Sequence, residues 1–118
     1  MRKAMLISLA LLAASAAMGE GAYKLRIDSS VRDGKLTIVP YAAAPAGSRL
    51  RYEMVSAKEG GAGKSSTRQG GTVQVGESGS ARLAILSLGV NPQDRYLVTV
   101  KLFDGRRLVA EDKLEYPR

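Results

Sequence analysis

The 118-residue sequence contains neither histidine nor cysteine, so carboxylates, hydroxyls and amines are the only side chains left for chemistry. Histidine is the commonest general base, and cysteine supplies thiolate nucleophiles and soft metal ligands. Most hydrolytic and redox mechanisms are therefore excluded. A disulfide is excluded on the same ground.

The carboxylates Glu111, Asp112 and Glu115 are candidates for acid/base chemistry or a hard-metal site. Neighbouring side chains of a strand point to opposite faces, so Glu111 and Asp112 are expected to diverge. Glu111, Lys113 and Glu115 would share one face, where alternating charge deters edge-to-edge pairing. We interpret this segment as a solvated strand, with no catalytic residue and no metal site.

A run of hydroxyls, Ser65-Ser66-Thr67, follows Lys64 and a glycine-rich stretch. A Ser–Lys dyad would need a buried, deprotonated lysine, which a glycine-rich surface segment does not favour. The stretch also lacks the G-x-x-x-x-G-K-[ST] spacing of a phosphate-binding loop and precedes no predicted helix. The sequence therefore predicts no nucleotide site, no cofactor and no enzymatic activity.

The amino-terminal segment is typical of a secretory signal, with a basic start, an apolar run over 4–14 and small residues after it. That run is too short to span a bilayer. Two cleavage positions fit, after Ala16 or after Gly19, and we favour Gly19. The predicted organisation is a signal peptide over 1–19 and one soluble, unanchored domain over 20–118.

The composition is basic, with 18 Lys and Arg against 11 Asp and Glu and a formal net charge of +7. Losing Arg2 and Lys3 with the signal would lower the net charge to +5. Positive charge favours acidic partners or anionic surfaces and speeds encounter with them. Export argues against nucleic acid. An acidic protein is favoured, with anionic envelope polysaccharide or lipid headgroups as the alternative.

Apolar residues after the signal recur at every second position, which is typical of half-buried strands. The predicted strands are seven: 23–29, 35–41, 49–56, 65–75, 81–88, 95–103 and 107–116. Pro40 has no amide hydrogen, so the second strand is expected to end, bulge or lie at an edge there. The pattern predicts an all-β fold, a seven-stranded, antiparallel, immunoglobulin-like β-sandwich.

Several residues are predicted to have structural roles. The segment 58–64 is rich in glycine and is expected to be a mobile loop. Gly70 and Gly71 interrupt the fourth strand and permit a bulge or the close approach of another backbone. Tyr96 follows a Pro-containing turn, as in the tyrosine corner of immunoglobulin-like sandwiches, and is read as structural and not catalytic.

Six short motifs follow one another along the domain, each occurring once: Tyr52-Glu53, Gly63-Lys64-Ser65, Gln69-Gly70-Gly71, Asp94-Arg95-Tyr96, Ala110-Glu111-Asp112 and Leu114-Glu115-Tyr116-Pro117. Together they resemble the CsgH branch of curli assembly proteins. Those proteins are small periplasmic immunoglobulin-like domains, similar to CsgC, that keep the major curlin subunit from forming amyloid before secretion. The CsgC branch carries a Cys-x-Cys pair, which is absent here, so any activity must be non-redox.

The resemblance implies a periplasmic, monomeric, chaperone-like protein that needs no ATP. Its expected partner is the major curli subunit, with other curli secretion components as further candidate partners. We expect its client-binding residues to be cations on strand faces and loops: Arg49, Arg51, Lys64, Arg68, Arg95, Lys101, Arg106 and Arg107. Solvated charge is the default for any one surface residue, so the hypothesis concerns the group. The sequence does not identify the strand that meets the client.

Overall fold

The computed structural model describes residues 22–61 and 63–117. Their eight strands are β1 (Lys24–Arg32), β2 (Lys35–Ala43), β3 (Arg49–Gly60), β4 (Gly63–Gln74), β5 (Ser80–Arg82), β6 (Leu86–Gly89), β7 (Arg95–Asp104) and β8 (Arg107–Tyr116). The predicted signal peptide over 1–19 lies outside the described residues. Within the described ranges, no helix is long and apolar enough to cross a membrane.

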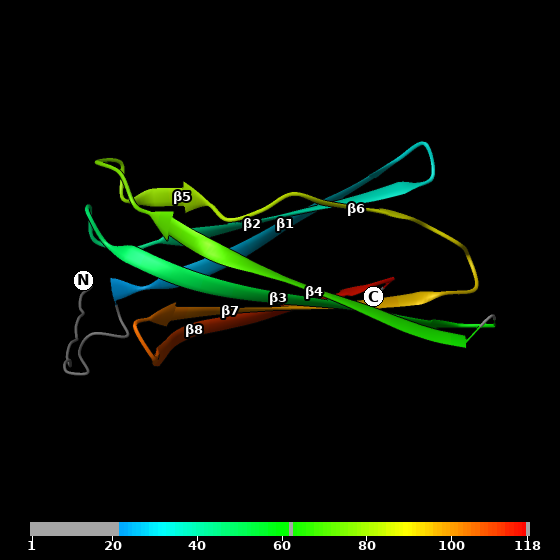
Figure 1. The fold of residues 1–118 in the computed structure, drawn as a ribbon. Helices are drawn as coiled ribbons and strands as arrows, with labels where there is room; N and C mark the ends of the chain where they lie inside the picture. Colours follow the sequence, from blue (N-terminus) through cyan, green and yellow to red (C-terminus); the bar gives the residue numbers. More distant parts are fainter. Residues whose placement is uncertain (1–21, 62, 118) are drawn as a thin grey trace, which may run out of the picture.

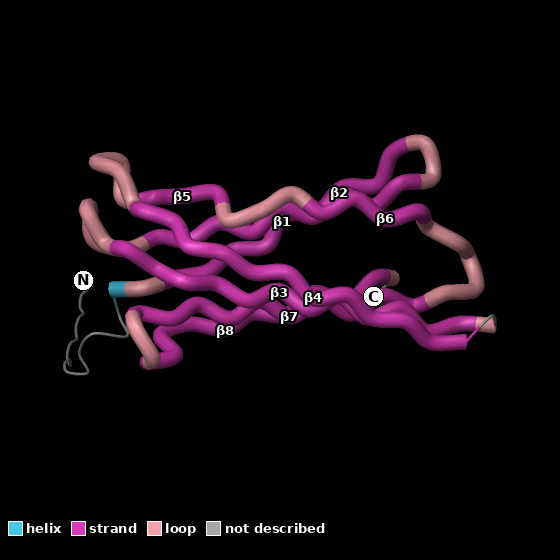
Figure 2. Tube along the Cα trace, viewed as in Figure 1, coloured by secondary structure: helices cyan, strands magenta, loops and turns pink. Residues whose placement is uncertain are grey.

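The strands form two antiparallel sheets that face each other (Figure 1). Sheet A contains β1, β2 and β5 in that order, with β6 also paired to β2, and sheet B has the order β4-β3-β7-β8. The loops gather at the two ends of the sandwich (Figure 2). The all-β, antiparallel sandwich that the sequence predicts is confirmed, and the chain passes from sheet A to sheet B between β2 and β3, after residue 43.

The predicted number of strands is corrected from seven to eight, because the segment 81–88 forms β5 and β6 instead of one strand. Pro40 gives the physical reason. β2 runs through Pro40 without a bulge and lies in the middle of sheet A, so the expectation that the strand ends, bulges or lies at an edge there is wrong. The Pro40 carbonyl accepts the Leu83 amide at 2.9 Å. In an antiparallel strand, the N–H and C=O groups of one residue point toward the same neighbouring strand. Pro40 points its carbonyl toward residues 83–85 but has no N–H group to donate to them. The partner strand breaks there.

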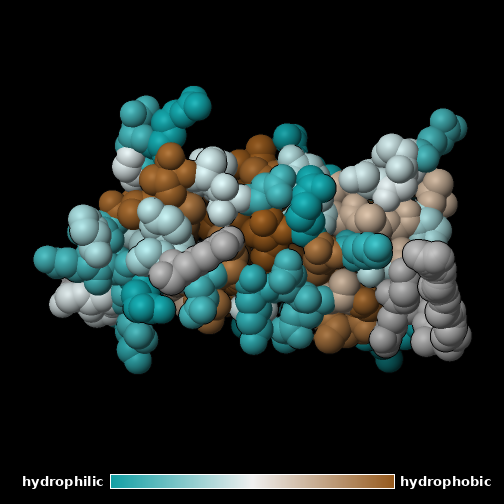
Figure 3. Space-filling view, turned by 180° about the vertical axis from the view of Figure 1, so that it is seen from behind, coloured by the Kyte–Doolittle hydropathy of each residue, from teal (hydrophilic) through white to brown (hydrophobic). Residues whose placement is uncertain are grey.

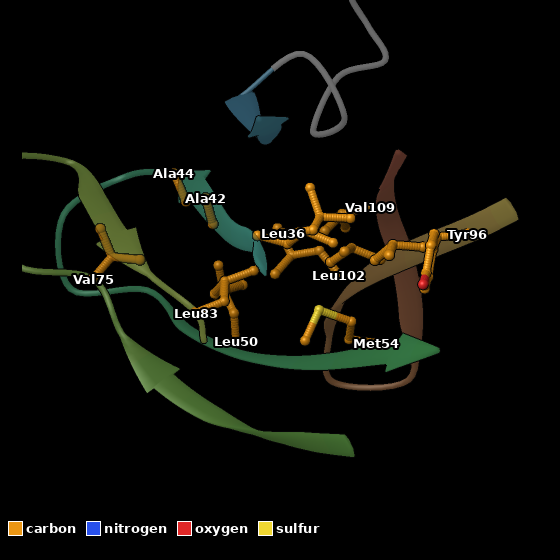
Figure 4. Packing of buried hydrophobic residues seen from close by; sticks show 13 residues of the cluster. Leu36, Ala42, Ala44, Leu50, Met54, Val75, Leu83, Tyr96, Leu102 and Val109 are labelled. Atoms are coloured by element: carbon orange, nitrogen blue, oxygen red, sulfur yellow. The ribbon is translucent and has the colours of Figure 1, made fainter. Parts of the chain in front are cut away.

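The core lies between the sheets and is built by alternation along β2, β3 and β7 (Figure 4). The fully buried side chains that these three strands contribute include Leu36, Ile38, Leu50, Met54, Val98, Val100 and Leu102. Complete burial of one such side chain contributes about 1.5–3 kcal/mol. With no cysteine in the sequence, this core and the two hydrogen-bonded ladders hold the domain together.

The β3–β4 connection is a tight hairpin, so the loop predicted over 58–64 is wrong. β3 continues to Gly60, which pairs with Gly63 at the start of β4. Gly63 has a φ of 116°, in the left-handed region that favours glycine. Gly60 lies against the Asp94 side chain, which would have to move to make room for a Cβ at this position. The glycines therefore permit a sharp turn and close packing. The other residues of the segment belong to the end of β3 and the start of β4.

Gly70 and Gly71 lie where β4 approaches β3 closely, and the β3–β4 register runs through them without a shift. A Cβ on Gly70 would be 2.8 Å from the backbone oxygen of Tyr52, closer than side chains tolerate. A Cβ on Gly71 would be 3.2 Å from the Tyr52 ring, which lies over that glycine from the neighbouring strand. The aromatic ring thus covers backbone that glycine leaves bare.

Two tyrosines fix the ends of the sandwich. Tyr96 Oη donates to Gly89 O at 2.8 Å and accepts from Asn91 N at 3.2 Å, which ties the β6–β7 connection to the core. Tyr23 Oη donates to Asp104 Oδ2 at 2.7 Å and joins the chain before β1 to the end of β7. That hydrogen bond, the partial burial of the phenol and the Asp104 charge raise the pKa of Tyr23 above its ordinary value.

Candidate functional site: the outer face of sheet B

The outer face of sheet B is formed by the strand residues that alternate with the buried ones. The register of β3 with its neighbours brings six of the predicted client-binding residues onto this one face: Arg49, Arg51, Lys64, Arg68, Arg95 and Lys101. The other two, Arg106 and Arg107, lie at the β7–β8 turn at one end of the same sheet. Residues distant in sequence therefore share a single surface.

Acidic side chains share this face and compensate part of its charge. The basic set is Arg49, Arg51, Lys64, Arg68, Arg95, Lys101 and Lys113, and the acidic set is Glu53, Glu59, Glu111 and Glu115. With seven cations and four carboxylates, this face has a net charge of +3. Ion pairs join Arg51 to Glu53 at 2.7 Å, Lys64 to Glu59 at 3.5 Å and Arg95 to Glu115 at 4.0 Å. Exposed pairs of this kind are weak, typically below about 1 kcal/mol each, and can exchange for a ligand.

Glu53 is the carboxylate at the middle of this face. The hydrogen bond from Arg51 holds the pKa of Glu53 below its ordinary value, opposed by some desolvation and assisted by the charges of Arg51, Arg68 and Lys101. Glu53 is therefore ionised at neutral pH. Its charge is shared among three cations from three strands, which shows that β4, β3 and β7 contribute to one electrostatic surface.

Apolar side chains on this face are the feature that sequence reasoning missed. The Arg51 guanidinium lies over the Phe103 ring, 4.2 Å from its centroid. Leu97 is 39% exposed, and Leu108, which pairs with Phe103, is 42% exposed. The sequence does contain this information, because successive side chains of a strand point to opposite faces. If Tyr96 and Leu102 are buried, then Leu97 and Phe103 must face outward. The surface can thus contact apolar as well as acidic groups.

The outer face of sheet A is also basic, which sequence reasoning likewise missed. Its charged side chains are Lys24, Arg26, Arg32, Lys35 and Arg82, against the single carboxylate Asp28. Arg26 bonds Asp28 at 3.0 Å and lies over the Tyr41 ring, 4.6 Å from its centroid. Figure 3 views the sandwich edge-on from behind, so that both sheets are seen from the side, and shows hydrophilic side chains projecting between apolar ones.

The carboxylates of β8 do not converge. Glu111 pairs with Lys101 on the outer face, whereas Asp112 pairs with Val100, whose side chain is in the core. Among residues 22–61 and 63–117, no group of three or more acidic side chains is placed to hold a metal ion. The outer face of sheet B is a sheet surface with more cations than carboxylates and with the exposed apolar residues Leu97 and Leu108.

The family model of Tafi-CsgC, described as a thin aggregative fimbriae synthesis protein, matches residues 20–114. Curated relatives include the curli assembly protein CsgC of Escherichia coli strain K12 and of Escherichia coli O1:K1 / APEC. Each is 32% identical over 72 residues, which cover 61% of this chain and 66% of the relative. The matched region thus spans just under two thirds of the length of these relatives.

Two solved structures share the fold. The solution structure of R. palustris CsgH matches with a TM-score of 0.64 and 18% identity, over 79% of this chain and 91% of that one. The E. coli curli protein CsgC matches with a TM-score of 0.60 and 23% identity, over 81% of this chain and 99% of that one. At these identities the likeness establishes the two-sheet architecture.

Proposed function

The chain belongs to the Tafi-CsgC family of thin aggregative fimbriae synthesis proteins, and from that premise we propose that it acts in curli assembly as a periplasmic, chaperone-like inhibitor. It binds the major curli subunit transiently and prevents premature amyloid formation, without ATP. The curated relatives of this family are curli assembly proteins and not enzymes. Export to the periplasm relies on the predicted signal peptide over 1–19 and is testable by cell fractionation.

The observation that carries this proposal is the composition of the outer face of sheet B. A surplus of positive charge speeds encounter with an acidic polypeptide, and the effect weakens as salt rises. The exposed ion pairs Arg51–Glu53 and Lys64–Glu59 can open at little cost, so cations become available to client carboxylates. Leu97 and Leu108 offer exposed apolar contacts that remain when salt screens the charges.

A shallow, solvated surface also explains why binding should be transient. Tight interfaces need a desolvated centre with side chains held in pockets, whereas rim-like charges mainly raise the association rate. Amyloid nucleation depends on rare encounters between partly ordered strands. A protein that engages such strands briefly and often can delay nucleation at low molar ratios, which requires no energy source.

The test follows thioflavin fluorescence of the purified major curli subunit with substoichiometric amounts of this domain. Wild-type protein is expected to lengthen the lag phase, and the triple variant Arg49→Glu, Arg51→Glu, Arg68→Glu is expected to lose most of that effect. The matched control reverses three cations on the other sheet: Lys24→Glu, Arg26→Glu, Arg82→Glu. Both triples change the charge by the same amount, and each removes one ion pair and one cation–π contact.

Circular dichroism should first establish that both triple variants are folded. An unchanged lag phase with the wild type would end the proposal. Equal loss in the two triple variants would contradict the assignment to sheet B and indicate that total charge, and not this face, determines activity.

A second candidate function is binding to anionic envelope polysaccharide or lipid headgroups, and the outer face of sheet A favours it. That face has five cations against one carboxylate, a more one-sided balance than sheet B. Such a surface attracts anionic layers through its field. Co-sedimentation with anionic and neutral liposomes, using the same two triple variants, tests this candidate: only the sheet A variant should lose binding.

A further inference from the structure

Strand β4 is the longest edge strand of the described structure, with 12 residues. It pairs only with β3, so its other side is free. Eight consecutive residues, 63–70, are exposed, although their partners on β3 include the buried Met54 and Ser56. No proline and no register shift interrupt the strand. An uninterrupted free edge is a template on which another strand can pair.

One backbone hydrogen bond next to β4 shows which of its backbone groups face the free edge. Val75, which directly follows β4, donates its amide to Ser48 O at 2.8 Å. Successive residues of a strand face opposite neighbours, so the odd-numbered residues of β4 bond to β3. The residues whose N–H and C=O groups face the free edge are Lys64, Ser66, Arg68, Gly70, Thr72 and Gln74.

The other edge strands are protected. β8 has a register shift between Leu102 and Phe103 on its partner β7, and the amide of Lys113 is occupied by Asp112 Oδ1 at 2.9 Å. β5 and β6 are short and separated by the break opposite Pro40. β1 lies alongside β8, near the Tyr23–Asp104 bond. Shortness, bulges and occupied donors are the devices that block strand addition.

The side chains of β4 define the chemistry of a strand that would fit beside it. On the outer face stand Lys64 and Arg68, with Ser66 between them. On the inner face stand Ser65 and Gln69, which are exposed and uncharged. In a paired strand, opposite residues share a face and opposite charges attract. The complementary strand therefore has carboxylates at alternate outer positions and hydroxyl or amide side chains on the other face.

We propose that the free edge of β4, over residues 63–70, accepts one extended strand of an acidic client by backbone pairing. The carboxylates of that strand lie beside Lys64 and Arg68, and its Ser, Thr, Asn or Gln side chains lie beside Ser65 and Gln69. This inference rests on the proposed function and deepens it, because it adds a docking edge to the steering face. The outer face of sheet B attracts the client, and β4 pairs with one extended client strand. The backbone groups of that client strand would otherwise pair with another client strand in a fibril.

A second copy of this chain is a poorer occupant. In an antiparallel pair of β4 strands centred on Ser66, Lys64 of one copy would lie opposite Arg68 of the other. Like charges directly opposite each other are destabilising. In this register like charges disfavour a second copy, whereas an acidic strand places opposite charges beside Lys64 and Arg68.

The variant that tests the edge is Ser66→Pro. The Ser66 amide faces the free side, so proline removes a donor for the client and no hydrogen bond to β3. The matched control is Ser66→Ala, which removes the same hydroxyl and keeps the amide. The probe is a capped peptide with two glutamates four residues apart, serine between them and glutamine or threonine at the alternate positions. A peptide with lysines in place of the glutamates controls for charge.

We expect the acidic peptide to bind wild type and Ser66→Ala alike, and Ser66→Pro about tenfold more weakly, because one backbone bond and its neighbours are lost. NMR should show that the acidic peptide protects the wild-type amides of Lys64, Ser66 and Arg68 from exchange. That measurement needs no variant and stays decisive if Ser66→Pro is unstable. Binding without this protection would overturn strand addition, and concentration-dependent dimerisation through β4 would identify a second copy as the occupant instead.

The curlin lag-phase assay separates this inference from the proposed function. If wild type and Ser66→Pro lengthen the lag equally, the edge is not the docking site, and inhibition by the outer face stands. If wild type leaves the lag unchanged, the proposed function fails. The peptide and exchange measurements then decide by themselves whether β4 accepts an acidic strand.

Discussion

The two edges of sheet B, β4 and β8, differ although they belong to the same sheet. At the β8 edge, a register shift lies between Leu102 and Phe103, and Asp112 occupies the amide of Lys113. At the β4 edge, the register is uninterrupted and the residues 63–70 are exposed. Gly70 and Gly71 let β4 lie close to β3, and no strand pairs with the other side of β4.

The difference indicates how a small β-sandwich can handle aggregation-prone strands without aggregating. Two open edges would allow end-to-end growth, because each added strand would present a new one. One protected edge ends any such chain. The open edge carries Lys64 and Arg68, so it discriminates by charge. Substitutions at and beside each edge can test what maintains it.

The β4 edge depends most on the absence of a side chain at Gly70. In Gly70→Val, the new Cβ would be 2.8 Å from the Tyr52 oxygen, so β4 must move away from β3. We expect a loss of about 2 kcal/mol in the free energy of unfolding, within the usual cost of overpacking, measured by urea denaturation. Thr72→Val is the control, because it places the same side chain on the same face of β4 at a site that already has a Cβ. Equal stability of the two variants would contradict the close approach.

On the β8 side, the Tyr23–Asp104 hydrogen bond joins the two sheets. Tyr23→Phe removes the donor and leaves the ring, so we expect a loss of about 1 kcal/mol at neutral pH, measured by urea denaturation. This loss is smaller than that for Gly70→Val because no backbone must move. An equal effect of Tyr116→Phe, whose ring faces Tyr96, would show that the loss does not depend on this bond.

The same bond predicts a pH dependence with a definite sign. The pKa of Tyr23 is raised in the folded protein, chiefly by its hydrogen bond to Asp104, then by burial and by the Asp104 charge. The stabilisation is therefore fully present below the ordinary pKa of tyrosine and is lost as pH rises through the folded value. The difference in urea midpoint between wild type and Tyr23→Phe should shrink above about pH 10. A difference that stays constant there would contradict the assignment.

How much of this could be predicted from sequence depends on the range of the interactions. Alternation along 95–103 and 49–56 predicts which side chains form the core, because side-chain direction is a local property of strands. The break at residues 83–85 could not be predicted, since it arises where Pro40 meets a partner 43 residues away. The hairpin at Gly60–Gly63 was missed because glycines that terminate strands resemble glycines that prevent them.

In the candidate site, too, the features that depend on local alternation could be predicted from sequence, and those that depend on tertiary pairing could not. Alternation suffices to place Arg49, Arg51 and Lys101 on strand faces pointing away from the core. Register, which depends on tertiary pairing, is needed to bring Glu53 between Arg51 and Arg68 and to set Phe103 beside Arg51. Edge status is the least local property of all. Nothing in the sequence of β4 distinguishes a free edge from a paired strand.

The occupied amide of Lys113 should matter little for stability and more for exchange. Asp112→Ala frees that amide, and we expect a change of about 0.5 kcal/mol or less in unfolding, with faster hydrogen exchange at Lys113. Glu111→Ala is the control, because it removes a neighbouring carboxylate that faces the outer side of the sheet. If both variants leave the exchange of Lys113 unchanged, the Asp112 carboxylate does not protect this edge.

The smallest effect connects the open edge to the charged face. The pKa of Glu53 is lowered by the Arg51 hydrogen bond and charge and, to a lesser extent, by the charges of Arg68 and Lys101. Its contribution to stability is present above the ordinary glutamate pKa and is lost as pH falls through the folded value. Arg51→Gln should raise the pKa of Glu53 most, Arg68→Gln by less and Arg49→Gln not at all, as followed by NMR titration.

The same titration reports on strand addition, because a client carboxylate beside Arg68 would compete with Glu53 for that charge. Saturation with the acidic peptide should raise the pKa of Glu53 in wild type and leave it unchanged in Arg68→Gln. A rise of equal size in both proteins would mean that the peptide lies over the centre of the face and not along β4. Glu53 thus distinguishes a client held at the open edge from one that only visits the outer face.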